Sequence, residues 1–270
     1  MERGTQSLDK ISEPIHTVWL AVHRVDEILT ADNERSDWDG LPQVERDRIE
    51  RFRQPKDRRQ RLAATLLARR ALAQATGRPE SDLRWQRTAL GRPYLINPEY
   101  RGDFNLSHHD EWVAVAWTDE GLVGVDLATL GEVREAVAQY AFSASEWEYL
   151  QTLNSGPKKA RASTILWALK EAYGKALGFG MDRRRSRVSF VPATLAGECF
   201  VLAAPEAGWE FSVVQHDAMT VLAVAHDRKY TLQRVNLGTG QKDTHGEQPS
   251  YRGCSQKCLI IGHGAGEEQL

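Results

Sequence analysis

One amphipathic segment, Trp167–Gly178, constrains the fold of this chain more than any other stretch. Within it and just before it, apolar residues recur at the spacing of an α-helix, at Ile165, Leu166, Leu169, Ala172, Tyr173, Ala176 and Leu177. Charge interrupts the pattern at Lys170, Glu171 and Lys175. Glu171 and Lys175 share one helix face, because they lie four residues apart. An exposed salt bridge on a core helix would explain an isolated pair of this kind.

A short apolar run upstream, Leu122–Leu127, has the character of a buried strand and carries one carboxylate, Asp126. A charge in such a strand is costly unless it is paired or binds a metal. Asp126 is therefore a candidate partner for the charged face of the helix.

A second upstream segment, Phe104–His109, precedes the strand-like stretch Trp112–Trp117. A turn at Asp119–Gly121 then leads into the strand of Asp126, which predicts a β-hairpin. This hairpin would place the Ser107 end of one strand beside the Asp126 end of its neighbour.

Four motifs in order resemble the 4'-phosphopantetheinyl transferases. They are Phe-Asn-Leu-Ser-His from Phe104, Gly-Val-Asp ending at Asp126, Phe-Ser-x-x-Glu from Phe142 to Glu146, and Trp-x-x-Lys-Glu-x-x-x-Lys from Trp167 to Lys175. The similarity is to the two-lobed, monomeric type that activates acyl, peptidyl and aminoadipate-type carrier proteins, and it runs from about Arg46 to about Val191. Each motif alone is weak, but their order and spacing make a specific signal.

Each half of the chain combines one long helix with several strands, which predicts an α+β fold. The long helix of the first half is expected over Asp57–Thr76, with Gly77 ending it. The resemblance implies a pseudodimer of two similar lobes, each a small antiparallel sheet packed with a long helix. We expect a loose leader at 1–14, an N-terminal lobe at 15–120, a C-terminal lobe with the metal site at 121–233, and a disordered tail at 234–270.

Composition excludes several other classes of protein. The 270 residues carry a net charge of −2, so the chain as a whole is no polyanion binder, although residues 46–70 and Arg183–Arg187 are locally basic. Three cysteines suggest no disulfide framework, which favours a reducing cytoplasm. No apolar run approaches the roughly 20 residues that cross a bilayer. An RNA- or DNA-binding protein is disfavoured, because no aromatic-rich RNA motif or zinc finger accompanies the arginines.

The resemblance implies transfer of phosphopantetheine from coenzyme A to a carrier-protein serine, with release of 3',5'-ADP. Asp126 and Glu171 match the ligands of a Mg²⁺ ion, for which Mn²⁺ is an alternative. The family often has a third acid two residues after the aspartate, where this chain has Ala128. Either a water fills that position, which we favour, or metal binding and activity are weakened. Glu171 is ranked as ligand first and as general base second.

The coenzyme A phosphates require cationic or hydrogen-bonding side chains. The resemblance assigns the 3'-phosphate to Arg48, Arg59, Arg87, Arg92 and His108. Lys175 is expected at the pyrophosphate, Lys170 either there or in solvent, and Ser107 as a hydrogen-bond donor to a phosphate. Glu146 either orients Lys175 or caps its own helix, since Ser143 precedes it by three residues.

The competing function is a coenzyme A- or carrier-binding regulatory homologue that has lost catalytic strength, an idea motivated by Ala128 and the unusual tail. The sequence does not name the carrier protein, because partner choice depends on surface shape and charge. Nor does it say whether acylated coenzyme A is accepted.

Overall fold

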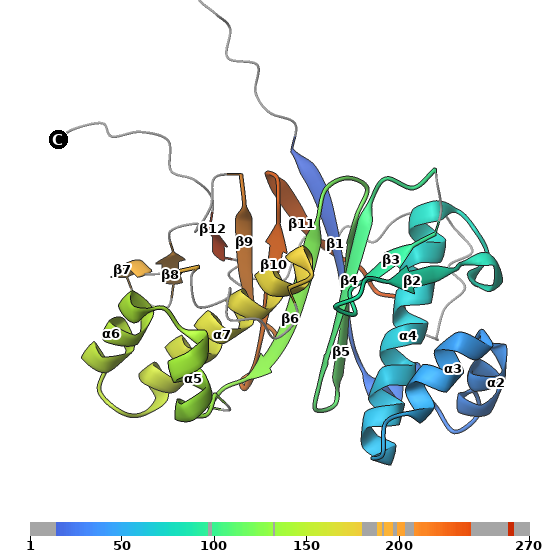
Figure 1. Cartoon of the computed structure of the whole chain (residues 1–270), viewed down its shortest axis with the longest axis horizontal. Helices are drawn as coiled ribbons and strands as arrows, with labels where there is room; N and C mark the ends of the chain where they lie inside the picture. The colour runs from blue at the N-terminus through green and yellow to red at the C-terminus, as the bar shows by residue number, and fades with distance from the viewer. Residues whose placement is uncertain are drawn as a thin grey trace, which may run out of the picture.

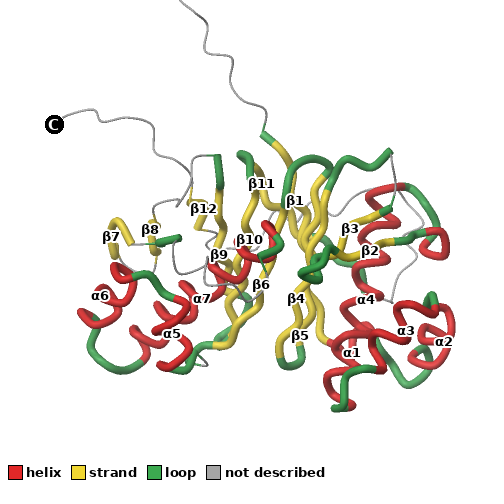
Figure 2. Tube along the Cα trace, in the orientation of Figure 1, coloured by secondary structure: helices red, strands yellow, loops and turns green. Residues whose placement is uncertain are grey.

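The computed structural model describes residues 15–96, 99–131, 133–179, 188–190, 192–196, 199–202, 208–238 and 259–261. Two four-stranded sheets stand beside each other in the middle of the molecule, and helices cover both flanks (Figure 1, Figure 2). The predicted α+β class, with a long helix on each sheet, is confirmed. No helix of the described part of the chain is long and apolar enough to cross a membrane.

The first sheet has the order β11-β1-β5-β4, with β1 at His16–Arg24, β4 at Asp103–His109, β5 at Trp112–Thr118 and β11 at Tyr230–Arg234. Its pairs are antiparallel except β1 with β11, which run parallel. The same half contains α1 (Val25–Ile28), α2 (Glu34–Gly40), α3 (Gln43–Glu50), the long α4 (Pro55–Thr76), a 3₁₀ turn (Glu80–Asp82) and the hairpin of β2 (Trp85–Arg87) with β3 (Pro93–Leu95).

The second sheet has the order β12-β9-β10-β6 and is antiparallel throughout, with β6 at Val123–Thr129, β9 at Glu210–Gln215, β10 at Thr220–His226 and β12 at Leu259–Ile261. Its helices are α5 (Glu135–Ala141), α6 (Ala144–Thr152) and the long α7 (Pro157–Leu177). A separate two-stranded ribbon joins β7 (Pro192–Ala196) to β8 (Cys199–Leu202).

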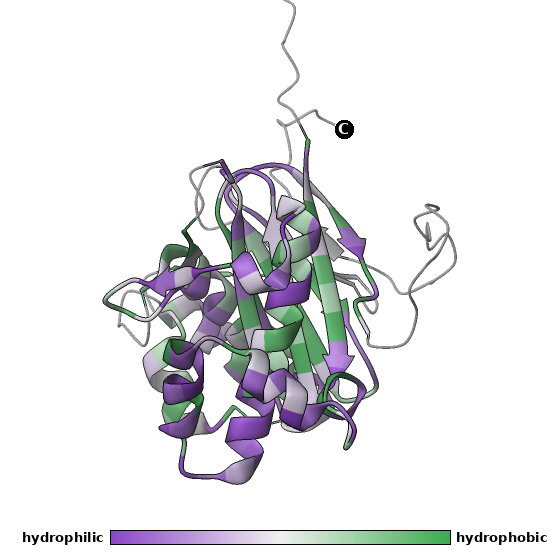
Figure 3. Ribbon diagram, turned by 90° about the vertical axis from the view of Figure 1, so that its right-hand side faces the viewer, coloured by the Kyte–Doolittle hydropathy of each residue, from purple (hydrophilic) through white to green (hydrophobic). Residues whose placement is uncertain are grey.

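The hydrophobic core of the described residues has three parts, which lie between four layers: helix α4, the first sheet, the second sheet and helix α7. One part packs α4 on the first sheet, and another packs α7 on the second. The third lies between the sheets, where Val18 and Leu20 of β1 share a cluster with Val125 of β6 and Val224 of β10. The hydrophobic strands therefore lie inside, and the helices turn many hydrophilic residues outward (Figure 3).

The two long helices begin and end in the same way. Pro55 and Pro157 stand in their first turns, where proline costs no hydrogen bond. Gly77 and Gly178 follow their last turns with φ of 66° and 71°, a left-handed conformation that favours glycine. The predicted helix ending at Gly77 is confirmed.

A row of side chains joins the two sheets along β4 and β6. The alternating residues Asp103, Asn105 and Ser107 of β4 accept hydrogen bonds from the backbone N–H groups of Val123, Val125 and Leu127, at 2.8, 3.5 and 3.1 Å respectively. We call this row the seam. It satisfies N–H groups on an edge strand that would otherwise lack partners.

Gly124 sets the distance between β6 and α7. A Cβ atom at this position would lie 1.9 Å from the carbonyl oxygen of Ala172 and 2.8 Å from the nitrogen of Ala176. Only glycine permits so close an approach of strand and helix. The alternate residues of β6, Asp126 and Ala128, therefore face α7 as well.

The structure differs from the predicted hairpin. β5 pairs with β1 and β4, whereas β6 pairs with β10 in the other sheet. The chain therefore changes sheets after β5, and side chains of the seam replace backbone pairing. Ser107 and Asp126 still meet, because the seam places β4 beside β6.

The division at residues 120 and 121 does not follow the sheets strictly, because β11 returns to the first sheet beside β1. Within the tail that was expected to be mostly disordered, the structure describes residues 235–238 and Leu259–Ile261, an apolar triplet that pairs with the edge of β9. Three of the segments discussed above lie outside the described residues: the predicted leader at 1–14, tail residues 239–258 and 262–270, and the arginines of 183–187.

Candidate active site

Asp126, Ser107 and Lys175 form a hydrogen-bonded group where β6, β4 and α7 meet. Lys175 Nζ lies 2.6 Å from Asp126 Oδ1 and donates to Ser107 Oγ at 3.0 Å and to the carbonyl of Val125 at 3.1 Å. The Ser107 hydroxyl donates to Asp126 Oδ1 at 3.1 Å and accepts from the N–H of Leu127. All hydrogen-bonding positions of this serine are therefore used, by Asp126, Lys175 and the N–H of Leu127.

Glu171 and Lys175 lie one turn apart on the face of α7 that meets β6. Glu171 is 9% exposed and Asp126 is 6% exposed, so the two carboxylates are largely shielded from bulk water. Lys175 keeps 27% of its side chain exposed. Burial makes the negative charges expensive, and nearby cations offset that cost.

A cavity of about 280 Å³ opens over these groups. Its walls are Arg61, Leu106, Ser107, His108, His109, Asp126, Leu127, Trp167, Glu171 and Lys175. We call it the carboxylate cavity. It brings together five residues singled out from the sequence: Ser107, His108, Asp126, Glu171 and Lys175.

The donor set of the carboxylate cavity fits a magnesium ion of one particular type. Mg²⁺ is commonly held by one or two carboxylates, with waters and substrate phosphates completing its shell. Asp126 and Glu171 supply the two carboxylates. The described residues contain no group of three or more His, Cys, Asp or Glu side chains that could hold a metal ion. Waters and substrate phosphates would therefore have to supply the remaining ligands. Ala128 packs into the core against α7 and offers no oxygen.

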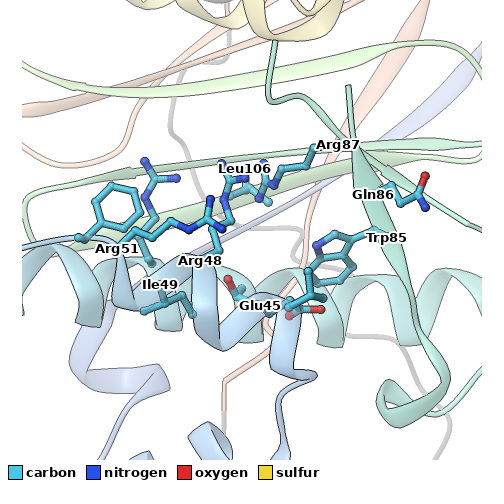
Figure 4. Close-up of a pocket in the computed structure, with 12 residues that line it drawn as sticks. Glu45, Arg48, Ile49, Arg51, Trp85, Gln86, Arg87 and Leu106 are labelled. Atoms are coloured by element: carbon cyan, nitrogen blue, oxygen red, sulfur yellow. The ribbon is translucent and has the colours of Figure 1, made fainter. Parts of the chain in front are cut away.

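A second cavity, of about 310 Å³, lies between α3, α4 and the β2 strand. It is lined by Val44, Glu45, Arg48, Ile49, Arg51, Phe52, Arg61, Thr65, Trp85, Gln86, Arg87 and Leu106. We call it the arginine cavity. Arg48 and Arg87 extend into it from α3 and β2, with Trp85 forming part of its wall (Figure 4). Arg61 and Leu106 line both cavities, which therefore adjoin.

Crowded positive charge marks the arginine cavity. Burial, with the charges of Arg48 and Arg61, lowers the pKa of Arg87 to about 10. Burial and neighbouring arginines also lower the pKa of Arg48 and that of Arg61. The acid in the wall, Glu45, is already bound to Arg69 at 2.8 Å. Such a cluster is suited to a multiply charged anion.

His108 differs from the cation expected at the 3'-phosphate. Burial, together with the charges of Arg61, Lys175 and His109, lowers the pKa of His108 to about 3. Its imidazole is therefore neutral at physiological pH, and it offers a ligand a hydrogen bond rather than a charge.

Two predicted coenzyme A ligands, Arg59 and Arg92, line neither cavity. The Arg59 guanidinium pairs with Glu34 at 3.0 Å on the outer side of α4. Arg92 pairs with Asp103 and donates to the carbonyl oxygens of Lys175 and Ala176 at 3.0 and 2.9 Å. As a cation at the C-terminus of α7, Arg92 positions the helix that carries Lys175.

Lys170, expected either at the pyrophosphate or in solvent, is buried and lines neither cavity. It is 1% exposed and bonds Glu146 at 2.8 Å. Glu146 also accepts from the N–H of Phe190 and forms the capping box of α6 with Ser143. Of the two alternatives for Glu146, the capping role is therefore confirmed.

Sequence reasoning passed over three residues that line the carboxylate cavity: Arg61, Trp167 and His109. For Arg61 a signal was present, because it stands four residues before Thr65 and eight before the buried Arg69 on one helix face. Trp167 was assigned to the core and does pack partly against it. His109 matched no motif.

Two family models match this chain. The model described as "4'-phosphopantetheinyl transferase, N-terminal" matches residues 34–120, and that described as "4'-phosphopantetheinyl transferase superfamily" matches residues 122–230. The two matches meet where the chain passes from the first sheet to the second.

Named relatives agree with these matches. The chain is 32% identical over 164 residues to a phosphopantetheinyl transferase of Thraustochytrium sp., covering 56% of this chain and 57% of the relative. It is 28% identical over 201 residues to the L-aminoadipate-semialdehyde dehydrogenase-phosphopantetheinyl transferase of Mus musculus, covering 67% and 65%. The chain thus spans less than two thirds of the length of each relative.

Among solved structures, the holo-[acyl-carrier-protein] synthase of Thermotoga maritima is 24% identical, with a TM-score of 0.31 over 40% of this chain and 63% of that one. This likeness is too weak to bear on fold or activity.

Proposed function

We propose that this chain, which belongs to the 4'-phosphopantetheinyl transferase superfamily, transfers the 4'-phosphopantetheine group of coenzyme A to a serine of an apo carrier protein. The reaction would depend on Mg²⁺ or Mn²⁺ and would release 3',5'-ADP. Its carrier would be of the acyl, peptidyl or aminoadipate type. The names of the relatives in Thraustochytrium sp. and Mus musculus support the reaction class.

One observation carries this proposal: two cavities of opposite character adjoin. The arginine cavity gathers Arg48 and Arg87, which suit a phosphate monoester at the nucleotide end of the substrate. The carboxylate cavity gathers Asp126, Glu171 and Lys175, which suit a pyrophosphate with a bound cation. Coenzyme A carries both groups on one nucleotide: a phosphate monoester at the 3' position of the ribose and a pyrophosphate at the 5' position.

In the proposed reaction the carrier serine oxygen attacks the pyrophosphate phosphorus nearest the pantetheine. A new P–O bond forms, the bond from that phosphorus to the bridging oxygen breaks, and 3',5'-ADP leaves with the electron pair. The serine proton must pass to a base. Such displacements are accelerated by aligning the reactants and neutralising charge on the phosphate oxygens.

The chain's own groups divide this work. A divalent cation held by Asp126 and Glu171 would supply charge neutralisation at the pyrophosphate. Lys175 adds a positive charge, and Ser107 and the carbonyl of Val125 hold its ammonium beside Asp126. Glu171 is assigned first as ligand and second as acceptor of the serine proton, because ligation lowers the basicity of a carboxylate.

The proposal extends to a cytoplasmic monomer that binds no nucleic acid. The low cysteine content supports the compartment. The monomer is supported by the site itself, since one chain contributes both β4 of the first sheet and α7 on the second. The alternative, motivated by Ala128, is a homologue that binds coenzyme A or a carrier without efficient transfer.

The deciding experiment is intact-mass spectrometry of an apo acyl carrier protein after incubation with this protein, coenzyme A and Mg²⁺. We expect a mass gain of one phosphopantetheine that EDTA prevents. The alternative predicts no gain with several carriers and with Mn²⁺, together with retained coenzyme A binding by calorimetry. Arg35→Ala is a suitable control variant, because Arg35 is exposed on α2 and lines neither cavity.

A further inference from the structure

Arg61 of α4 occupies the junction between the two cavities. We propose that Arg61 binds the nucleoside-side phosphate of the coenzyme A pyrophosphate, the group that becomes the 5'-phosphate of the departing 3',5'-ADP. This inference rests on the proposed function and adds a residue to it. No motif of the family resemblance includes this position.

The order of cations along the joined cavities supports the assignment. Arg48 and Arg87 line the arginine cavity and not the other, Lys175 lines the carboxylate cavity and not the other, and Arg61 lines both. Coenzyme A carries three phosphates: the 3'-phosphate, the nucleoside-side phosphate and the pantetheine-side phosphate. With the first at Arg48 and Arg87 and the last at Lys175, the middle phosphate falls to Arg61.

The present contacts of Arg61 leave its hydrogen-bonding capacity unused. Its guanidinium lies 4.4 Å from the centre of the Phe52 ring, a cation–π contact that uses none of its N–H donors. Its Nε is buried, and among the described residues it has no hydrogen-bond partner. No carboxylate of the described residues forms an ion pair with Arg61.

This arrangement is costly without an anion. Burial and the charge of Arg48 both lower the pKa of Arg61, which means that the surroundings of Arg61 oppose its positive charge. A buried polar group without a partner costs free energy that a ligand recovers. Arg59, two residues earlier, shows the contrast: its guanidinium is bound by Glu34 and the carbonyl of Leu29.

The location gives Arg61 a part in the chemical step. When the bond to the bridging oxygen breaks, the electron pair and the new negative charge remain on the nucleoside-side phosphate. A planar guanidinium can meet two oxygens of that phosphate with parallel N–H bonds. Arg61 would therefore stabilise the leaving group, a contribution that rises as the bond breaks.

Transfer kinetics with coenzyme A and with dephospho-coenzyme A test the assignment. Arg61→Ala should lower kcat about tenfold or more with both substrates, because both contain the nucleoside-side phosphate. Arg48→Ala should impair the reaction with coenzyme A and have little effect with dephospho-coenzyme A. If the effect of Arg61→Ala disappears with dephospho-coenzyme A, Arg61 serves the 3'-phosphate and the inference is wrong.

Three further variants separate charge, geometry and folding. Arg61→Lys should restore part of the rate, since it returns the charge without the bidentate fork. Arg35→Ala, at an exposed arginine of α2 that lines neither cavity, should match the wild type. Thermal melting of each variant shows whether the chain stays folded; a rate loss in Arg61→Ala that Arg61→Lys does not reduce at all, in variants that melt like the wild type, contradicts the electrostatic role.

Calorimetry provides a readout besides activity. Arg61→Ala should weaken binding of 3',5'-ADP about tenfold and leave binding of adenosine 3'-monophosphate unchanged. A wild type that shows this difference but transfers nothing would overturn the proposed function while supporting Arg61 as the 5'-phosphate ligand. A wild type that transfers, with no such difference between the nucleotides, would overturn the inference alone.

Discussion

Two lysines of α7, five residues apart, make nearly the same contact and have opposite surroundings. Lys170 lies 2.8 Å from Glu146, and Lys175 lies 2.6 Å from Asp126. The first pair is 1% and 0% exposed by side chain, and the second is 27% and 8% exposed. One pair is sealed in the core, whereas the other borders a cavity.

The comparison teaches that an ion-pair distance does not distinguish a pair sealed in the core from a pair that borders a cavity. The carboxylate of Glu146 pairs with Lys170 and accepts hydrogen bonds from the N–H groups of Ser143 and Phe190. Burial of both side chains shields that pair from ligands. Asp126 shares one oxygen with Lys175 and Ser107 and faces open space, so a substrate or cation can join it.

The largest expected effect is on activity, from Asp126→Asn, which keeps the shape of the side chain and removes its charge. We expect transfer to fall by about 1000-fold or more, because a metal ligand contributes several kcal/mol to the transition state. Intact-mass assays measure the rate, and circular dichroism should show a folded chain. An active variant would remove Asp126 from the site and break the comparison.

Next come the two lysines themselves. Lys170→Met should destabilise the fold by about 3–5 kcal/mol, because it leaves Glu146 charged and buried without its cation. Lys175→Met should cost less stability and most of the transfer rate, since its pair borders a cavity. Urea denaturation and rate assays on both variants measure the contrast. Equal stability losses would mean that the openness of the Lys175 pair has no energetic meaning.

Gly124→Ala tests whether the pair of Lys175 with Asp126 depends on how closely α7 approaches β6. The added Cβ would overlap the carbonyl of Ala172, so we expect about 1–3 kcal/mol of destabilisation and a lower transfer rate. Denaturant titration and kinetics give the two numbers. Normal stability and rate would show that the helix can shift away from β6 without disturbing Lys175.

A smaller effect concerns pH. The pKa of His108 is lowered to about 3 in the folded chain, against an ordinary value of 6.5, so the unfolded chain binds more protons between these values. Stability should therefore fall as pH drops below 6.5, by at most about 1.4 kcal/mol per pH unit from this group. Denaturation between pH 7 and 5 should show a shallower slope in His108→Gln. Identical slopes would refute the desolvation of His108.

The smallest effect is expected from ending the chain after Gly238. Among the described residues this removes β12, a three-residue edge strand, and keeps the bonds of Val235 to Leu20 and of Leu237 to His23. We expect a loss of about 1 kcal/mol or less by thermal melting and unchanged transfer. Ending after Arg234 instead removes those bonds too and should cost more. A large loss of transfer rate in the chain that ends at Gly238 would give the removed tail a role at the site.

The periodicity of apolar residues and the positions of helix-ending and turn residues predicted much of the fold. The helix ending at Gly77, the strand of Asp126 and the helix of Trp167 follow from local patterns that the structure keeps. The change of sheet after β5 did not follow, because a tight turn such as Asp119–Gly121 joins strands of one sheet or of two with the same residues. The side-chain hydrogen bonds of the seam decide which of these two arrangements forms.

Candidate site residues were predictable where charge interrupted an apolar strand or an apolar helix face. Asp126, Glu171 and Lys175 are of this kind, and the structure brings them to one cavity. Arginines on α4 were harder to assign, since Arg59 and Arg61 lie in one basic run and only packing decides which is buried. Lys170 lies beside Glu171 in sequence, yet its partner Glu146 is on another helix.

The seam also has a consequence for how the protein behaves at high concentration. An unpaired strand edge offers N–H groups to any passing extended chain and invites aggregation. On β6 those of Val123, Val125 and Leu127 are already held by Asp103, Asn105 and Ser107. Side chains of fixed spacing cover the edge without extending the sheet, so no new edge is created there. The residues that keep this strand from recruiting foreign chains thus include one, Ser107, that also holds Lys175.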